Sequence, residues 1–246
     1  MENEFSRTEM LFGKAAMEAL QRAHVAVFGV GGVGGHTVEV LARSGVGAID
    51  LFDNDTVSIT NLNRQLIALH STIGRPKVIV AAERIADINP HCQVEAHQTF
   101  YLPENADTID LGKYDYVIDC VDTVTAKIEL IKRCHEQEVP LICSMGAANK
   151  LDPCGFRVAD ISKTTMDPLA KVIRKKLRKL NIHHVKVVFS EEQPLSPLFL
   201  EASGKRVPAS NAFVPASAGL IIGGEVVKDI INKAHAMRVT DHQELG

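Results

Sequence analysis

Short apolar runs recur along the first half of the chain and alternate with longer stretches in which apolar residues return every three or four positions. The runs lie at 25–28, 48–52, 93–96, 116–118 and 141–143, and the longer stretches include 78–88 and 123–138. The first pattern is typical of buried strands and the second of amphipathic helices. Their alternation predicts an α/β fold with a Rossmann-like, mostly parallel, doubly wound sheet carrying helices on both faces.

The pattern changes after Gly146. The expected elements are a strand at 156–160, a helix at 168–180, a strand at 185–189, a long loop at 191–212 and a closing apolar helix at 216–232. Asp167-Pro168 suits a helix start, because aspartate caps the first turn and proline fits its first position. The side chains of the 168–180 helix that we expect to face the core are Val172, Ile173, Leu177 and Leu180. This C-terminal extension of strands and helices is predicted to complete the substrate side of the sheet.

A glycine-rich turn follows the first apolar run. It contains Gly29, Gly31, Gly32 and Gly34, spaced as Gly-x-Gly-x-x-Gly before a predicted helix. A turn of this kind leaves backbone N–H groups free to hold phosphate. Glycine loops also serve simple turns, but the strand and helix on either side favour nucleotide binding.

Acidic residues stand where two further strands are expected to end. Asp53 follows the second run, where a carboxylate accepts hydrogen bonds from ribose hydroxyls, whereas Asp55 is either part of the site or a solvated turn residue. Asp122 follows the fourth run, and a carboxylate facing phosphates requires Mg²⁺ between them. Asp119 is equally suited to a structural cap.

Polar and cationic residues beyond the acidic pair point to a triphosphate. They are Asn61, Arg64, Gln65 and Lys77. The two phosphates of NAD need little neutralisation by cationic side chains, whereas an arginine and a lysine together can neutralise the charge of a leaving pyrophosphate. Either cation taken alone is also consistent with an ordinary surface charge.

Together these motifs identify a family. The chain resembles the ThiF/MoeB/HesA superfamily of ubiquitin-activating-enzyme-like adenylating proteins in Gly29-x-Gly31-Gly32-Val33-Gly34, Asp53-x-Asp55, Asn61-x-Asn63-Arg64-Gln65, Gly74-x-Pro76-Lys77 and Asp119-x-x-Asp122. The resemblance implies an ATP site with Asp53 on the ribose, Arg64 and Lys77 on the phosphates, and Asp122 directing Mg²⁺. It also implies a homodimer in which Arg7 reaches the ATP of the partner, so the expected catalytic residues are Arg7, Arg64, Lys77 and Asp122.

The second half narrows the resemblance. The segments 144–147, 152–153, 158–164, 167–170 and 210–215 are similar to those of the tRNA threonylcarbamoyladenosine dehydratase family, so the likeness covers about Phe5 to Lys233. It implies ATP-dependent activation of the threonylcarbamoyladenosine carboxylate beside the tRNA anticodon, followed by cyclisation with loss of water. Because the attacking atom belongs to the same base, no enzyme nucleophile is required. Cys154 is the nearest candidate for a catalytic thiol, and an incidental cysteine is the simpler interpretation.

Charge is distributed unevenly. Residues 150–186 carry ten basic and three acidic side chains, a net charge of about +7, which leaves about −10 for the rest of a chain whose net charge is −3. The residues of the predicted basic helix that we expect to bind tRNA phosphates are Lys171, Arg174, Lys175, Arg178 and Lys179. A solvated helix face is the alternative. We also expect substrate contacts near Lys150, Lys163 and 210–217, with structural loops as the alternative.

Three other functions fit parts of the pattern. An adenylating activator of a ubiquitin-like or sulfur-carrier protein shares the ATP motifs, but it predicts paired CxxC zinc ligands or a thioester cysteine, which the sequence lacks. An NAD-dependent oxidoreductase leaves Arg64 and Lys77 without a role. A nucleotide sensor requires binding without turnover. A sulfur-relay protein stays open as a partner.

Composition places the chain among ordinary globular proteins. Hydrophobic residues make up 46% and charged residues 23% of its 246 residues, so we expect one ThiF-type domain. Its predicted parts are an N-terminal helical arm (1–23), a nucleotide-binding half (24–146), a half for substrate, tRNA and dimer contacts (147–234) and a frayed tail (235–246). The N-terminus lacks the features of a signal peptide and no segment suits a membrane span. Five scattered cysteines fit a reducing cytosol, so we expect a cytoplasmic protein.

Overall fold

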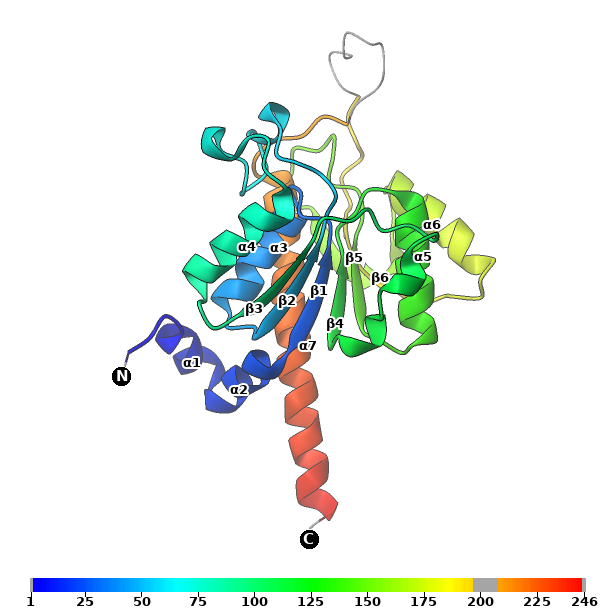
Figure 1. The fold of residues 1–246 in the computed structure, drawn as a ribbon. Coiled ribbons are helices and arrows are strands. Elements are labelled where there is room, and N and C mark those ends of the chain that lie inside the picture. Colours follow the sequence, from blue (N-terminus) through cyan, green and yellow to red (C-terminus); the bar gives the residue numbers. More distant parts are fainter. Residues whose placement is uncertain (1, 197–207, 245–246) are drawn as a thin grey trace.

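A seven-stranded sheet forms the centre of the computed structural model, and helices cover both of its faces (Figure 1). The structure describes residues 2–196 and 208–244. The strands are β1 (His24–Phe28), β2 (Ala48–Phe52), β3 (Gln93–His97), β4 (Tyr116–Asp119), β5 (Leu141–Ser144), β6 (Phe156–Asp160) and β7 (Lys186–Ser190). Their order is β3-β2-β1-β4-β5-β7-β6, and only the β6–β7 pairing is antiparallel. The predicted mostly parallel, doubly wound sheet is therefore confirmed.

The helices follow the predicted alternation closely. They are α1 (Ser6–Phe12), α2 (Lys14–Arg22), α3 (Gly34–Arg43), α4 (Lys77–Ile88), α5 (Val124–Glu136), α6 (Pro168–Arg178) and α7 (Val214–Glu244). Short 3₁₀ turns lie at η1 (Ile59–Asn61), η2 (His70–Thr72), η3 (Ala106–Thr108), η4 (Leu111–Lys113) and η5 (Ile161–Lys163). The side chain of Asp167 accepts a hydrogen bond from the Ala170 N–H and Pro168 follows it, so α6 begins as predicted.

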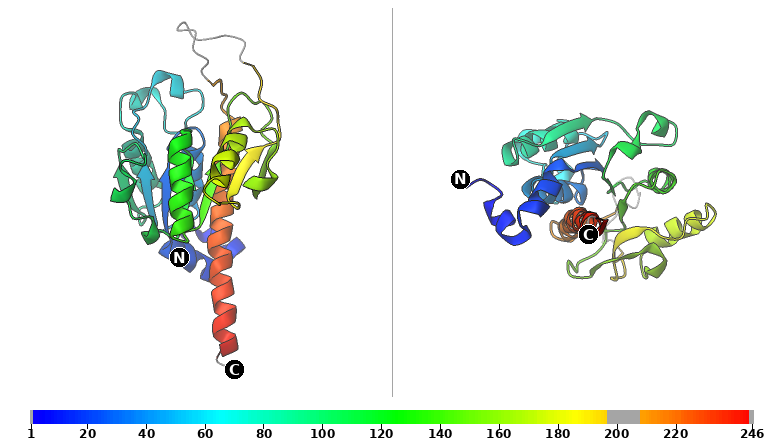
Figure 2. Two further views of the ribbon diagram at one scale, coloured as in Figure 1. Left: turned by 90° about the vertical axis from the view of Figure 1, so that its right-hand side faces the viewer. Right: turned by 90° about the horizontal axis from the view of Figure 1, so that it is seen from below.

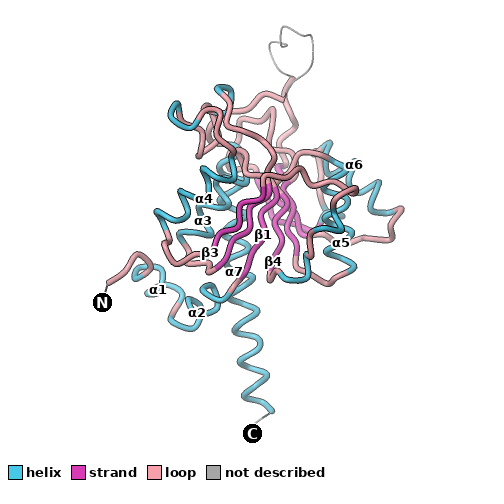
Figure 3. The backbone as a smooth tube through the Cα atoms, in the orientation of Figure 1, coloured by secondary structure: helices cyan, strands magenta, loops and turns pink. Residues whose placement is uncertain are grey.

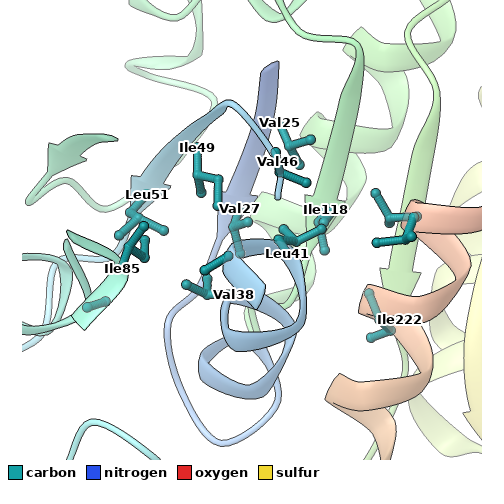
Figure 4. Packing of buried hydrophobic residues seen from close by; sticks show 14 of the residues in the cluster. Val25, Val27, Val38, Leu41, Val46, Ile49, Leu51, Ile85, Ile118 and Ile222 are labelled. Carbon is teal, nitrogen blue, oxygen red and sulfur yellow. The ribbon is translucent and has the colours of Figure 1, made fainter. Parts of the chain in front are cut away.

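Alternate residues of the central strand are buried on opposite faces of the sheet. Val25 and Val27 of β1 belong to a core that includes residues of α3, α4 and α7, whereas Ala26 and Phe28 belong to a core that includes residues of α5. Figure 4 shows part of the first core, with Val27 near Leu41. A parallel strand that is covered on both faces must be apolar throughout, which is why its run lacks polar alternation.

Close backbone contact joins α7 to α3. A Cβ atom added at Gly219 would lie 2.3 Å from the carbonyl oxygen of Val33, and one added at Gly223 would lie 2.6 Å from the Cβ of Val40. Only glycine allows the two helices to approach this closely. The start of α7 is thereby fixed beside the glycine-rich turn from which α3 begins.

The C-terminal helix is longer than predicted. The sequence indicates a closing helix at 216–232 and a frayed tail at 235–246, but α7 continues to Glu244 and leaves the body of the molecule (Figures 1 and 2). No glycine or proline occurs between 225 and 245, so no residue there interrupts the helix. Residues 245–246 of the expected tail, and 197–207 of the expected loop, lie outside the described residues.

Two apolar residues of the predicted 168–180 helix were wrongly assigned to the core, and that helix ends at Arg178. Ile173 and Leu177 are buried as predicted, but Val172 and Leu180 are each 44% exposed. A helix of this kind buries one narrow stripe, and Val172 lies one position away from that stripe. Within the described residues, no helix is long and apolar enough to cross a membrane.

Candidate nucleotide site

The glycine-rich turn lies at the carboxyl edge of the sheet, where the loops gather (Figure 3). Gly29 has a φ of +89°, and a Cβ there would lie 2.8 Å from the carbonyl oxygen of Cys120. A Cβ at Gly34 would lie 1.8 Å from the carbonyl oxygen of Gly29. These two glycines set the shape of the turn. At Gly31 the nearest atom is the Nε2 of Gln65, 3.8 Å away, so the backbone there has room for a ligand.

Asp53 ties the glycine-rich turn to the residues that follow β2. Its Oδ2 accepts from the Val30 N–H at 2.7 Å and its Oδ1 accepts from the Asp55 N–H at 2.9 Å. The Nζ of buried Lys77 donates to the Oδ2 of Asp55 at 2.7 Å and lies 4.0 Å from the Oδ1 of Asp53. The structure thus brings together the predicted ribose and phosphate residues, although Asp53 is 23 positions from Val30 in sequence.

Arg64 lies directly against the same turn. A Cβ added at Gly32 would meet the Cγ of Arg64 at 3.3 Å and the Cβ of Pro215 at 3.2 Å. The guanidinium donates to the Thr60 carbonyl at 3.1 Å and to the Oδ1 of Asn63 at 2.8 Å. A cation is therefore held beside backbone that can bind phosphate, as the sequence predicts.

The remaining members of this segment differ in their surroundings. The Oδ1 of Asn61 accepts from the Ser58 N–H at 3.0 Å, which holds η1 in place. Gln65 is 7% exposed, and its Oε1 is buried without a hydrogen-bond partner among the described residues. An unpartnered buried carboxamide oxygen is an unusual cost, and a ligand that donates a hydrogen bond to it would remove that cost.

Two acidic residues after β4 have different roles. Asp119 is fully buried, and its Oδ2 accepts from the Nζ of equally buried Lys127 at 3.0 Å. Burial lowers the pKa of Lys127, but the adjacent Asp119 carboxylate outweighs burial and raises it. Asp119 is accordingly structural. Lys127 was not singled out from the sequence, because a lysine in a helix is ordinarily expected at the protein surface. Asp122 is exposed and accepts from the Oγ1 of Thr123 at 3.4 Å, so its carboxylate is accessible.

Three asparagines fix the segment that leads into α7. Asn149 accepts from the N–H of Leu195 at its carbonyl and from the N–H of Ala209 at its Oδ1, at 2.7 and 2.8 Å. Asn211 donates from Nδ2 to the carbonyl of Lys150 at 2.9 Å. Asn63 donates from Nδ2 to the carbonyl of Ser210 at 3.1 Å. Asn63 belongs to a recognisable motif, but its role could not be predicted, since a contact across 147 positions leaves no local signal in the sequence.

Lys150 lies inside the protein rather than on its surface. Its Nζ donates to the carbonyl of Gly146 at 2.9 Å and lies 3.6 Å from the Oδ2 of Asp167, and the residue is 3% exposed. Burial lowers its pKa. The ammonium group therefore joins the loop after β5 to the start of α6. Lys163, by contrast, is exposed in η5.

The basic helix presents most of its predicted cations to solvent. The side chains of Lys171, Lys175, Arg178 and Lys179 are exposed, as is that of Lys176. Arg174 is different, because its guanidinium donates to the Thr164 carbonyl at 2.9 Å and is half-buried. Four of the five predicted contacts are thus accessible to an anionic partner.

Arg7 is exposed on α1, near the amino ends of the strands and away from the glycine-rich turn (Figure 1). It therefore lies outside the site of its own chain.

Cys154 is exposed, and burial raises the pKa of the Cys134 and Cys143 thiols. None of these three cysteines is in a setting that would activate it as a thiolate.

The chain is similar in sequence and in structure to proteins of known family. Residues 5–236 match the ThiF family. The tRNA threonylcarbamoyladenosine dehydratase of Bacillus subtilis (strain 168) is 51% identical over 98% of this chain and 100% of its own length. The crystal structure of E. coli tRNA N6-threonylcarbamoyladenosine dehydratase in complex with ATP matches with a TM-score of 0.86 and 36% identity, over 95% of this chain and 96% of that one.

A second group of relatives is similar over a shorter stretch. The molybdopterin-synthase adenylyltransferase of Salmonella typhimurium is 38% identical over 57% of this chain and 55% of its own length.

Proposed function

Because this chain belongs to the ThiF family, and within it to the tRNA threonylcarbamoyladenosine dehydratases, we propose that it dehydrates threonylcarbamoyladenosine in tRNA with the use of ATP. The observation that carries the proposal is the full-length similarity to the Bacillus subtilis dehydratase, at 51% identity. The arrangement of Arg64 and Lys77 around the glycine-rich turn supports it independently, because it suits a triphosphate that is cleaved.

ATP binds at the carboxyl edge of the sheet. The turn formed by Gly29, Gly31, Gly32 and Gly34 receives the phosphates at the start of α3. Asp53, with Asp55 beside it, accepts from the ribose hydroxyls. Arg64 and Lys77 neutralise the phosphate charge that develops as the leaving group departs. Asn61 and Gln65 complete the site, with Gln65 supplying a buried carboxamide near Gly31.

Mg²⁺ fits the residues present on the β4 side. Asp122 offers an accessible carboxylate on the loop that meets the glycine-rich turn at Cys120. Carboxylate oxygen is a normal ligand for this ion, and substrate phosphates commonly supply others. When bound, the ion would neutralise phosphate charge.

The reaction needs activation more than it needs a protein nucleophile. A carboxylate is a poor electrophile. Transfer of a phosphoryl-containing group from ATP to one carboxylate oxygen turns that oxygen into part of a good leaving group. The attacking atom lies in the same modified base, so the protein has to orient the ends and exclude water. This accounts for a site with cations and amides but without an activated cysteine among its described residues.

Several partners follow from the same proposal. The proposed tRNA-binding surface is the exposed face of α6 together with the residue that follows it. It comprises Lys171, Arg174, Lys175, Arg178 and Lys179. Within it, Arg174 positions the helix rather than contacting phosphate. A homodimer would let Arg7 reach the ATP of the partner subunit. In support of a dimer, α1 exposes the apolar side chains of Met10 and Leu11 by 82% and 79%, and a subunit contact would cover them. A sulfur-relay protein is a further proposed partner, and the cytoplasm is the proposed location.

An adenylating activator of a ubiquitin-like or sulfur-carrier protein is the alternative. The partial similarity to the molybdopterin-synthase adenylyltransferase favours it. The absence of any CxxC pair in the sequence weighs against its zinc-containing forms.

Mass spectrometry of nucleosides distinguishes the two functions. Purified protein is incubated with threonylcarbamoyladenosine-bearing tRNA, with and without ATP and Mg²⁺. A loss of the mass of one water that requires ATP supports the dehydratase. No loss, together with adenylation of a carrier-protein C-terminus, would establish the alternative.

A further inference from the structure

The segment 210–215 is held on both sides of the site. Toward the nucleotide, the carbonyl of Ser210 accepts from Asn63 at 3.1 Å, and the Cβ of Pro215 lies 3.2 Å from a Cβ position at Gly32. Toward the second half, Asn211 donates to the Lys150 carbonyl at 2.9 Å. A segment tied at both ends offers a fixed position for any side chain that it presents to solvent.

Phe213 is that side chain. It is 49% exposed, although the Oδ1 of Asn211 accepts from its N–H at 3.1 Å and its own carbonyl accepts from Ser217 at 3.0 Å in the first turn of α7. The backbone is therefore fixed while the ring meets solvent. An aromatic ring on an ordered backbone loses little conformational entropy on binding.

Exposed aromatic rings are scarce in this protein. The chain contains no tryptophan, and its three tyrosines are each at most 4% exposed. Among the phenylalanines that the structure describes, Phe100 is the other one exposed to a similar extent, at 44%. Phe100 follows β3 at the far edge of the sheet, whereas Phe213 lies two residues before the proline that touches the glycine-rich turn.

We propose that Phe213 is a stacking platform for an unpaired base of the substrate RNA loop. Unpaired RNA bases are commonly bound by stacking on aromatic side chains. The inference rests on the proposed function, which brings the anticodon loop to this edge of the sheet. It assigns a base-binding residue, whereas the charges of α6 supply only phosphate contacts.

The adenine of ATP is a second source of the same chemistry, but the geometry disfavours it. Gly32 and Arg64, beside Pro215, form the phosphate end of the proposed ATP site, and Asp53 holds the ribose. The adenine extends beyond the ribose, away from that end. Phe213 therefore meets the incoming substrate rather than the nucleotide.

Phe213→Trp provides a direct test, because it introduces the one tryptophan of the chain. We expect its fluorescence to be quenched on titration with an anticodon stem–loop RNA, without ATP, and to be unchanged by ATP alone. Phe100→Trp is the matched control and should not respond to the RNA. Quenching by ATP alone, or equal responses of the two variants to RNA, would overturn the proposal.

Steady-state kinetics give a second test. Phe213→Ala should lower kcat/KM for the modified tRNA by about tenfold, since base–aromatic stacking contributes about 1–3 kcal/mol, and Phe213→Trp should retain it. Phe213→Leu, which keeps apolar volume without an aromatic face, should resemble the alanine variant, and the KM for ATP should not change in any of them. A leucine variant with full activity would contradict stacking.

The controls separate this inference from the proposed function. Dehydration by the wild-type protein tests the function, so an unaffected Phe213→Ala variant alongside an active wild type refutes only the role of Phe213. A change in oligomeric state in Phe213→Ala, measured by light scattering, would instead make Phe213 a subunit contact and overturn the proposal.

Discussion

The Nδ2 of Asn63 lies 3.1 Å from the carbonyl oxygen of Ser210 and donates to it, while the Oδ1 of the same carboxamide accepts from Arg64. One side chain thus joins the proposed phosphate-binding arginine to the segment that begins α7. The nitrogen and the oxygen of the carboxamide make different contacts, so a substitution can remove one contact and keep the other.

Asn63→Asp should separate them. The aspartate keeps an acceptor for Arg64 but loses the donor to Ser210 and places a carboxylate against a carbonyl oxygen. We expect kcat/KM for modified tRNA to fall by about tenfold, the equivalent of roughly 1.4 kcal/mol, while the Kd for ATP changes much less. Isothermal titration with ATP and single-turnover dehydration measure the two quantities.

Asn105→Asp is the matched control for that experiment. Asn105 also donates from Nδ2 to a backbone carbonyl, that of Phe100 at 2.9 Å, and its Oδ1 accepts from the Leu102 N–H at 2.8 Å. The same exchange therefore removes the same kind of bond in the loop that follows β3. If both variants lose activity equally, Asn63 has no specific positioning role.

Arg64→Ala and Lys77→Ala should each lower turnover by more than about tenfold with the fold intact, because each removes transition-state charge stabilisation. The Lys77 variant should remain folded, since Asp55 has 58% of its side chain exposed to water and buried Asp53 keeps the hydrogen bonds from the Val30 and Asp55 N–H groups. Arg43→Ala serves as the control, because Arg43 has 57% of its side chain exposed and its partner Glu39, at 2.7 Å, keeps a second pair with Arg84. Normal kcat in both site variants, with circular dichroism confirming the fold, would remove their phosphate roles.

Sequence periodicity predicted the sheet because the central strands β1, β4 and β5 are short and mainly apolar, and the helices between strands return to an apolar face every three or four residues. The glycine-rich turn and Arg64 were found for a similar reason, since they belong to contiguous motifs. The contacts of Asn63 and Lys150 could not be predicted, because they depend on residues distant in sequence. Lys150 looks like a surface cation until the Gly146 carbonyl and Asp167 are placed around it.

Charge reversal on α6 should weaken RNA binding without affecting ATP binding. The variant carries glutamate at Lys171, Lys175 and Lys179, all of which are exposed. Each lost phosphate contact reduces the slope of log K against log salt by about 0.7 to 0.9. Binding is measured by fluorescence anisotropy of labelled tRNA at several salt concentrations. An unchanged affinity and slope would place the tRNA surface elsewhere.

Lys132→Glu on α5 is a suitable single-site control for Lys175→Glu. Its Nζ lies 3.8 Å from Glu129 and its side chain is 40% exposed, so it tests loss of a surface lysine on the helix that packs beside α6. Arg174 should behave differently from both. Arg174→Gln removes a donor from the Thr164 carbonyl, and we expect a lower melting temperature rather than a changed salt slope.

Breaking the buried Asp119–Lys127 pair should be more harmful than replacing it entirely. Lys127→Met leaves an uncompensated carboxylate in a fully buried position, which typically costs about 3–5 kcal/mol. Asp119→Leu together with Lys127→Met removes both charges and should recover much of that loss. Urea unfolding of the single and double variants measures the difference. A double variant less stable than Lys127→Met would show that the pair contributes net stability.

Asp50 should make the fold sensitive to acid. Burial raises the pKa of its carboxyl, but hydrogen bonds from His24, Tyr114 and Lys113 outweigh burial and lower it below the ordinary value. The nearest atoms of those groups lie 2.7–3.0 Å from its oxygens. A depressed pKa means that the ionised carboxylate stabilises the native state above the unfolded pKa of about 4, and that this contribution disappears as the pH falls through the folded pKa.

Asp50→Asn tests this sign directly. The amide cannot titrate, so the variant should be less stable than wild type at pH 7 but should lose less of its remaining stability on acidification below about pH 5. Urea unfolding of both proteins across this range gives the two slopes. Glu95 and His97 also face this cluster, with the Nε2 of His97 3.8 Å from Asp50 and 3.4 Å from Glu95, and both remain in the variant. Parallel slopes of the two proteins would show that ionisation of Asp50 does not stabilise the fold.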